Sequence, residues 1–243
     1  MRFRIVSYNI HKGIGGVDLR YRPERIVDTI AHYEPDIVLL QEVDDGVPRS
    51  RRHRQVDTIA DALGMRYRAF QANVRLRIGD YGNATLSHYP IKAHRNVELT
   101  IPFKKRRRAL VVRMALSGDE GRHQTIWIAN VHLGLAGFER RMQVKRLLAS
   151  GPMRRVRANT PLILGGDFND PFHRLERPVI EPAGFRPVAG PMNTFPAAIP
   201  MQSLDRFYYR GPLTVEGAFV GHTLLARQAS DHRPVIADFV LKE

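Results

Sequence analysis

Residues 161–170 read Pro161-Leu162-Ile163-Leu164-Gly165-Gly166-Asp167-Phe168-Asn169-Asp170, and this stretch is the best guide to the fold. A short, unbroken apolar run of this kind is typical of a strand buried on both faces. The run ends in an acid, Asp167. Residues 36–42 have the same form, because four consecutive apolar residues lead to Gln41-Glu42. Both segments therefore predict core strands that end in polar side chains.

Periodicity predicts further elements on either side of these two strands. Residues 2–10 alternate as a strand, with Phe3, Ile5, Ser7 and Asn9 on one face. Pro23 opens a helix that ends before Pro35, and a second helix covers about residues 55–63. Helical spacing in a third segment predicts a helix over 138–148 with an apolar stripe of Phe138, Met142 and Leu148.

The remaining strands are expected at residues 67–71, 83–87, 109–116, 125–132, 204–209 and 234–241. Strands alternating with helices favour an α/β class, although this pattern does not distinguish one sheet from two. No internal repeat or low-complexity linker interrupts the chain, so a single domain is expected over residues 1–243.

Polar residues recur at, or just beyond, the ends of the apolar runs. They comprise four carboxylates, two amides and two histidines: Glu42, Asp167, Asp205, Asp231, Asn9, Asn169, His132 and His232. Side chains at strand ends can converge above a rigid sheet, and hard oxygen ligands suit Mg²⁺ or Mn²⁺. Taken singly, each residue has an ordinary explanation, such as a turn for Asn9 or a solvated strand end for Glu42.

Composition restricts the chemistry and suggests a partner. The chain has no cysteine, which excludes disulfides and thiolate metal sites. The net charge of +14 favours a polyanionic partner, either nucleic acid or an anionic membrane surface. With no signal-peptide pattern and no window of ~20 apolar residues, a soluble, cytoplasmic protein without a transmembrane segment is expected.

Several motifs occur in an order that is informative as a set. They are Ser7-Tyr8-Asn9-Ile10-His11, Gln41-Glu42, Gly82-Asn83-Ala84-Thr85-Leu86-Ser87-His88-Tyr89-Pro90-Ile91, Asn130-Val131-His132-Leu133, Gly166-Asp167-Phe168-Asn169, Ser203-Leu204-Asp205-Arg206 and Ser230-Asp231-His232-Arg233-Pro234. The chain thereby resembles the endonuclease/exonuclease/phosphatase (DNase I-like) superfamily over nearly its whole length. It is most similar to short bacterial members, which are related to a group often encoded beside cardiolipin synthases.

The resemblance implies a fold and a reaction. The fold is a four-layer α/β/β/α sandwich, an α+β architecture with two mostly antiparallel sheets and the site at one end. The reaction is hydrolysis of phosphoester bonds with Mg²⁺, for which Mn²⁺ is a plausible substitute. One departure bears on the metal. Many relatives carry Asp two residues after the first-strand Asn, where this chain has His11, which weakens the case for a second metal ion.

The resemblance also assigns roles to the motif residues. Glu42, with Asn9 beside it and Asp231 in addition, is expected to bind the metal. Asp167 is expected to orient or deprotonate the attacking water, which Asn169 helps to hold. The other expected catalytic residues are a His232–Asp205 dyad and His132 as a phosphate contact or leaving-group acid. Which of Asp167 and His232 acts as the base stays open.

Substrate contacts are expected from Asn130 and from the arginines of two basic runs, residues 49–54 and 104–108. Arg108 opens an expected strand and is placed to reach the site, whereas Arg51, Arg52 and Arg54 could hold a phosphate backbone. A charge run is equally often a solvated face. A third basic run, Arg154-Arg155-Val156-Arg157, is open to the same two interpretations.

The motifs and the composition together leave three possible functions. A DNA endo- or exonuclease, working as a monomer, is the first. A phosphodiesterase or phosphatase acting on phospholipids or small molecules at an anionic membrane is the second, although no long apolar loop rimmed with Trp or Phe is evident in the sequence. A catalytically silent polyanion-binding module is the third, and the intact set of acids, amides and histidines argues against it.

Overall fold

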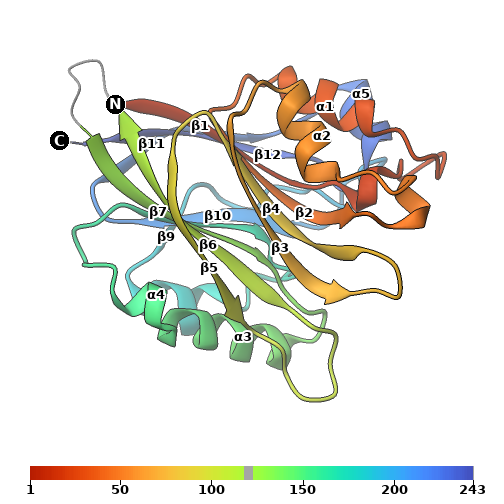
Figure 1. Cartoon of the computed structure of the whole chain (residues 1–243). Helices are drawn as coiled ribbons and strands as arrows, with labels where there is room; N and C mark the ends of the chain where they lie inside the picture. Colours follow the sequence, from red (N-terminus) through yellow and green to blue (C-terminus); the bar gives the residue numbers. More distant parts are fainter. Residues whose placement is uncertain (118–122, 243) are drawn as a thin grey trace.

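The computed structural model describes residues 1–117 and 123–242, which form two six-stranded sheets packed face to face (Figure 1). The first sheet has the order β11-β12-β1-β2-β4-β3, and the second has the order β5-β6-β7-β8-β10-β9. The first sheet comprises β1 (Arg2–Asn9), β2 (Ile37–Asp45), β3 (Tyr67–Arg75), β4 (Asp80–Ser87), β11 (Leu213–Val220) and β12 (Val235–Leu241). The second comprises β5 (Ile91–Glu98), β6 (Arg108–Ser117), β7 (His123–His132), β8 (Leu162–Asp167), β9 (Arg186–Pro187) and β10 (Asp205–Arg210).

Helices cover the outer face of each sheet (Figure 1). The first sheet carries α1 (Pro23–Ala31), α2 (Gln55–Ala62) and α5 (Leu224–Ala229), and the second carries α3 (Gly137–Ala149) and α4 (Gly151–Arg154). Short 3₁₀ turns occur at His11–Gly13, Pro48–Ser50 and Glu181–Ala183, and a π-helical turn occurs at Glu176–Ile180. These layers confirm the α/β/β/α sandwich expected from the sequence.

Consecutive residues of the core strands pack into different layers. Ile163 of β8 lies in the core between the two sheets, while its neighbour Leu164 packs under α3. Leu39 and Val38 of β2 divide in the same way between the inter-sheet core and the helices α1 and α2. Because both faces of these strands are covered, their sequences are continuous apolar runs rather than alternating ones.

The two sheets share one feature that positions the site. Each has a parallel pair at its centre, β1 with β2 and β7 with β8, while the other pairs are antiparallel. Parallel neighbours end at the same edge of a sheet. The four central strands therefore deliver Asn9, Glu42, His132 and Asp167 to one end of the sandwich. This end is called the site end below. The chain termini lie at the opposite end (Figure 1).

The structure departs from the expected elements in two ways. The helix expected at 138–148 forms, but Phe138 and Met142 are exposed, and Gln143, Val144 and Leu147 are among the residues that face the sheet. The strands β5 and β11 were not predicted. Both expose many of their side chains, so neither shows the apolar run used to find the core strands. Within the described residues, no helix has the length and apolarity needed to cross a membrane.

Candidate active site

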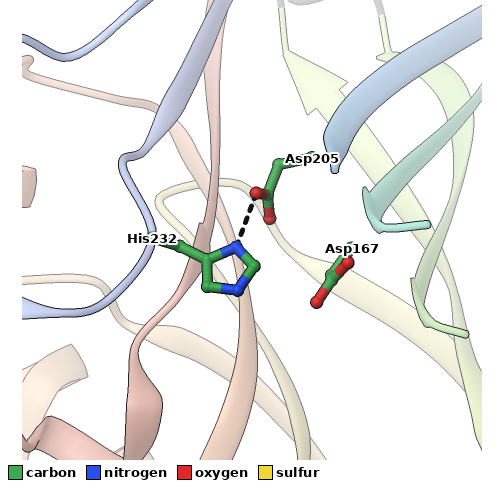
Figure 2. Close-up of side chains that lie close together, drawn as sticks. All are labelled: Asp167, Asp205 and His232. Atoms are coloured by element: carbon green, nitrogen blue, oxygen red, sulfur yellow. Dashed lines mark hydrogen bonds and ion pairs between the residues drawn. The ribbon is translucent and has the colours of Figure 1, made fainter. Parts of the chain in front are cut away.

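Strand register brings three of the expected catalytic residues together on the second sheet. Asp167, the last residue of β8, lies directly opposite His132 of β7 and Asp205 of β10. His232 approaches from the segment between α5 and β12 (Figure 2). All four side chains are buried, which the stems of strand-end residues allow because they remain in the packed sheet.

The His232–Asp205 pair has the geometry expected of a dyad. His232 Nδ1 lies 2.7 Å from Asp205 Oδ2, and the hydroxyl of Thr194 donates to the same oxygen over 2.6 Å. Burial lowers the pKa of His232, but the charge and hydrogen bond of Asp205 outweigh this effect and raise the pKa to about 10. Asp205 thus fixes the ring through Nδ1, and Figure 2 shows the other ring nitrogen on the side of Asp167.

Asp167 is held through both carboxylate oxygens. Asn9 Nδ2 donates to Oδ2 over 3.1 Å, and the backbone N–H of Asn169 donates to Oδ1 over 2.9 Å. His132 Nε2 lies 3.5 Å from Oδ2. Burial raises the pKa of the Asp167 carboxyl above its usual value. Burial also lowers the pKa of His132 to about 4, and the charge of Arg107 acts in the same direction.

Glu42 reaches the same end through an irregularity in β2. The register of β2 against β4 shifts between Leu40 and Val43, and Glu42 has a φ of +58°. A bulge of this kind redirects a side chain. Burial opposes ionisation of Glu42, but the positive charges of His132 and Lys12 hold its pKa at about 2. His132 is itself protonated in the pH range where Glu42 titrates.

Asn9 and Asp231 lie on the first-sheet side of the site. Ser230 Oγ donates to the backbone oxygen of Asn9 over 2.7 Å and so ties the segment that carries Asp231 to the end of β1. His11 Nε2 lies 3.9 Å from Asp231 Oδ2. The Asn9 side chain joins the two sheets, since its Oδ1 accepts from the His11 N–H and its Nδ2 donates to Asp167.

The donor chemistry of Glu42, Asn9 and Asp231 fits Mg²⁺. All three offer oxygen atoms, Glu42 is ionised, and its carboxylate already contacts a positive charge, the Lys12 ammonium group. A second cluster, Asp167, Asp205 and His232, has ligand atoms within 4.8 Å of one another. In that cluster, however, the hydrogen bond between His232 and Asp205 occupies atoms that a cation would need. The donor chemistry therefore favours Glu42, Asn9 and Asp231 as the residues that could hold a metal ion.

The residues expected to contact the substrate do not converge on the site as the acids and histidines do. Asn130 is fully buried (0% exposed), its amide donates to the backbone oxygens of Leu40 and Ala84, and its Oδ1 accepts from Gln41. The expectation of a substrate contact is therefore wrong in geometry, because this side chain ties the sheets together. Arg108 pairs with Glu98 over 2.9 Å and donates to the backbone oxygen of Ala72.

The arginines of the first basic run lie in the loop between β2 and α2, at the site end. Arg54 lies near Asp45 and Asp57, at 3.4 and 3.3 Å, and Arg51 lies over the Tyr21 ring. Arg52 is exposed. Two of the three expected contacts therefore already have partners within the protein.

Three residues at the site were missed by the sequence reasoning. Lys12 contacts Glu42, and Tyr81 of β4 packs beside both, with burial and the Glu42 charge raising its pKa. Arg107 is buried, its Nε has no hydrogen-bond partner, and its charge acts on His132 and Tyr81. Arg107 could have been found from the two-residue period, because the residue before Arg108 must face the opposite side of the strand.

Comparisons with known proteins identify the family. The profile of the Endonuclease/Exonuclease/phosphatase family matches residues 6–232. The uncharacterized protein YbhP of Escherichia coli (strain K12) is 28% identical, with 98% of this chain and 96% of that protein covered.

Solved structures share the fold. An endonuclease/exonuclease/phosphatase from Beutenbergia cavernae has a TM-score of 0.80 at 22% identity, covering 99% of this chain and 72% of its own. One from Bacteroides vulgatus has a TM-score of 0.78 at 18% identity, with both chains fully covered. Truncated Caenorhabditis elegans TDP2 has a TM-score of 0.71 at 20% identity, covering 98% and 97%.

A two-sheet sandwich with buried acids and histidines at one end defines a class of phosphoester hydrolases. The chain belongs to the Endonuclease/Exonuclease/phosphatase family, whose profile covers all the site residues described above. Members of this family depend on divalent metal ions.

Proposed function

We propose that this protein is a phosphodiesterase that uses Mg²⁺, with Mn²⁺ as a substitute, to hydrolyse phosphodiester bonds. The observation that supports it best is the buried Asp167 carboxylate. It is bonded from one sheet by Asn9 and flanked on the other by His132, and the His232–Asp205 dyad lies alongside. A structural role alone would not require so many polar side chains to be buried at one end of a sandwich.

The hydrogen bonds support the following roles. Glu42, Asn9 and Asp231 would hold the metal ion, which when bound neutralises charge on the phosphate and the leaving oxygen. Asp167, fixed through both oxygens, orients the attacking water and accepts its proton, and Asn169 lies beside it. His232 is held at Nδ1 by Asp205 and presents Nε2–H to a phosphate oxygen.

His132 and Arg107 complete the proposed site. His132 lies next to Asp167 and donates to the phosphate or to the leaving oxygen. Arg107 brings a buried positive charge to the same region, and this charge favours a phosphate bound there. We place Arg107 in the role that the sequence reasoning gave to Arg108.

DNA is the first substrate class to test, with the protein acting as a monomer. The net charge of +14 and the exposed Arg52 at the site end favour it, while the internal pairing of Arg54 and the stacking of Arg51 weaken it. A phosphodiester presented at a membrane is the second candidate, and it is favoured by the distribution of exposed apolar side chains described in the next subsection.

A substrate panel tests the proposal. It comprises plasmid, linear duplex, abasic duplex, RNA, phospholipids, inositol phosphates and a soluble bis-aryl phosphodiester, each with Mg²⁺, with Mn²⁺ or with EDTA. We expect metal-dependent hydrolysis of at least the soluble phosphodiester and much slower hydrolysis by Asp167→Asn. If the folded parent hydrolyses none of these with either metal, the proposed function is wrong, and salt-sensitive binding without turnover would indicate a binding module.

A further inference from the structure

Exposed large hydrophobic side chains are distributed unevenly over the molecule. In the described part of the chain, all of them lie on loops at the site end, in the first half of α3, near the end of β11 or at the start of α5: Val17, Leu19, Ile78, Phe103, Leu135, Phe138, Met142, Phe172, Ile199, Met201, Phe219 and Leu224. The described loops at the opposite end carry none. Single exposed apolar residues are ordinary, but a concentration of them at one end is a sign of an interaction surface.

Four of these side chains form what we call the apolar rim: Phe103, Leu135, Phe138 and Phe172. They are 107%, 73%, 56% and 72% exposed. Phe103 lies in the loop between β5 and β6, which projects beside the first turn of α3 at the lower right of Figure 1. Lys104 Nζ lies 5.4 Å from the centre of the Phe138 ring and so joins that loop to α3.

The apolar rim is continuous with the proposed active site. Leu135 follows His132 by three residues, and Phe172 follows Asn169 by three. The Asn169 side chain donates to the backbone oxygen of Leu133 over 3.0 Å, which links the two loops. The loop that carries Phe103 leads directly to the buried Arg107. Whatever the rim binds is therefore held against the mouth of the site.

The charges around the rim are positive. Lys105, Arg106, Arg141 and Arg174 are exposed within the same segments, and Arg174 lies 5.3 Å from the Phe172 ring. The acids of these segments, Glu139 and Asp170, are buried. Apolar tips surrounded by exposed cations match the interface of an anionic bilayer, where rings enter the headgroup layer and cations meet lipid phosphates.

We propose that the apolar rim inserts into the surface of an anionic phospholipid bilayer and seats the active site on it. The substrate class would then be the phosphodiester of a phospholipid headgroup, an assignment that rests on the proposed phosphodiesterase function, whereas the docking does not. Nucleic acid fits this surface less well. Base stacking needs ring faces, but Leu135 is aliphatic, and the rings come from three separate segments.

Vesicle flotation tests the docking directly. The full-length parent is mixed with phosphatidylcholine vesicles or with vesicles that also contain phosphatidylglycerol. The rim variant combines Phe103→Asn with Phe138→Ser, because asparagine accepts the left-handed backbone at 103 (φ +64°). The charge variant combines Lys105→Ser, Arg106→Ser and Arg174→Ser. Its matched control removes the same charge at the opposite end with Arg154→Ser, Arg155→Ser and Arg157→Ser.

We expect the parent to bind the anionic vesicles, and the rim variant to bind at least about tenfold more weakly, since burying one Phe is worth that factor. The charge variant should lose the preference for anionic lipid, while the control behaves like the parent. The thermal unfolding midpoints of all variants should equal that of the parent, because the replaced side chains are exposed.

Three results would overturn the docking proposal. The first is a parent that binds neither kind of vesicle, or a rim variant that binds like the parent. The second is a rim variant that loses duplex DNA binding but keeps vesicle binding. The third is a parent that dimerises in ultracentrifugation while the rim variant is monomeric. Hydrolysis of the soluble phosphodiester by the parent is measured in parallel, so failure of the catalytic proposal is seen separately from failure of the docking.

Discussion

The two ends of the sandwich are built from the same strands but differ in almost every other respect. At the site end, buried acids, amides and histidines meet below a rim of exposed apolar side chains. All but one of the described non-glycine residues with positive φ also lie there: His11, Lys12, Leu19, Glu42, Arg51, Arg52, Phe103, Asn169 and His173. The exception, Glu34, lies in the turn before β2 at the opposite end.

This difference shows at which end the fold tolerates features that lower its stability or solubility. Left-handed backbone, buried carboxylates and exposed phenylalanine each lower stability or solubility, and such features persist where they serve a function. The opposite end shows ordinary structural contacts, such as the Asp36 carboxylate accepting the backbone N–H of Arg4 over 2.7 Å. Substitutions at the two ends should therefore separate activity from stability.

The largest effect is expected from a matched pair of Asp→Asn changes. Asp167→Asn at the site end should lower turnover of the soluble phosphodiester by about a thousandfold, because it removes the group that orients and deprotonates water. Asp36→Asn at the opposite end should leave turnover unchanged and lower the free energy of unfolding by about 1 kcal/mol. Steady-state kinetics and urea denaturation of both variants measure the two effects. A loss of turnover in Asp36→Asn, with turnover unchanged in Asp167→Asn, would contradict the difference between the two ends.

The dyad predicts the next largest effect. Asp205→Asn and His232→Gln should each lower turnover by about a hundredfold, and the double variant should be about as slow as the slower single one. The reason is that Asp205 acts by holding the His232 ring through the 2.7 Å hydrogen bond. Rate constants for all three variants and the parent complete the cycle, and losses that multiply would show that Asp205 has a separate role.

Acid stability should also report on the site end. The pKa of His132 is about 4 in the folded protein, because burial disfavours the charged ring, and lies near 6.5 when the chain is unfolded. Between these values the unfolded chain binds the extra proton, so stability falls as the pH drops from about 6.5 to 4, by about 3 kcal/mol. Urea denaturation in EDTA should show a shallower loss for His132→Gln, and equal slopes would contradict the assignment.

The smallest effect concerns the basic runs. If Arg51, Arg52 and Arg54 contact a phosphate backbone, replacing them with Ser should reduce the salt dependence of duplex binding by about 0.9 per lost contact. The internal partners of Arg51 and Arg54 make a reduction of about one contact the expected result. Fluorescence anisotropy over a salt series should show no such reduction for the Arg154, Arg155 and Arg157 variant. Identical slopes for both variants would mean that the run at 49–54 is only solvated.

The sequence predicted the parts of the site that depend on core strands. Asp167 and Glu42 end continuous apolar runs. Strands that are buried on both faces produce such runs, so they can be recognised from the sequence alone. Their convergence depended on two parallel pairs lying at the centres of two facing sheets. The local sequence does not show how the strands are ordered in the sheets. The roles expected for the motif residues therefore came from the family resemblance and not from periodicity.

Three failures have definite physical reasons. Asn130 lies in a site motif, but its amide donates to buried backbone oxygens. Sequence alone does not show which polar side chains are hydrogen-bonded within the fold and so cannot contact a substrate. Arg108 was expected to reach the site, but in the structure it pairs with Glu98 and the backbone oxygen of Ala72, while the preceding residue, Arg107, is buried. No long loop rimmed with Phe was found because the apolar rim draws single residues from separate segments.

The central claim is that Glu42 anchors a divalent metal without which the site end cannot hydrolyse a phosphodiester. The most direct measurement is the Mg²⁺ dependence of hydrolysis of the soluble phosphodiester, for the parent and for Glu42→Gln, after exhaustive dialysis against EDTA. Our account predicts no activity before Mg²⁺ is restored, full recovery by the parent, and at least about a tenfold higher Mg²⁺ requirement for Glu42→Gln. Full activity of the dialysed parent in EDTA, or identical Mg²⁺ curves for the two proteins, would contradict it.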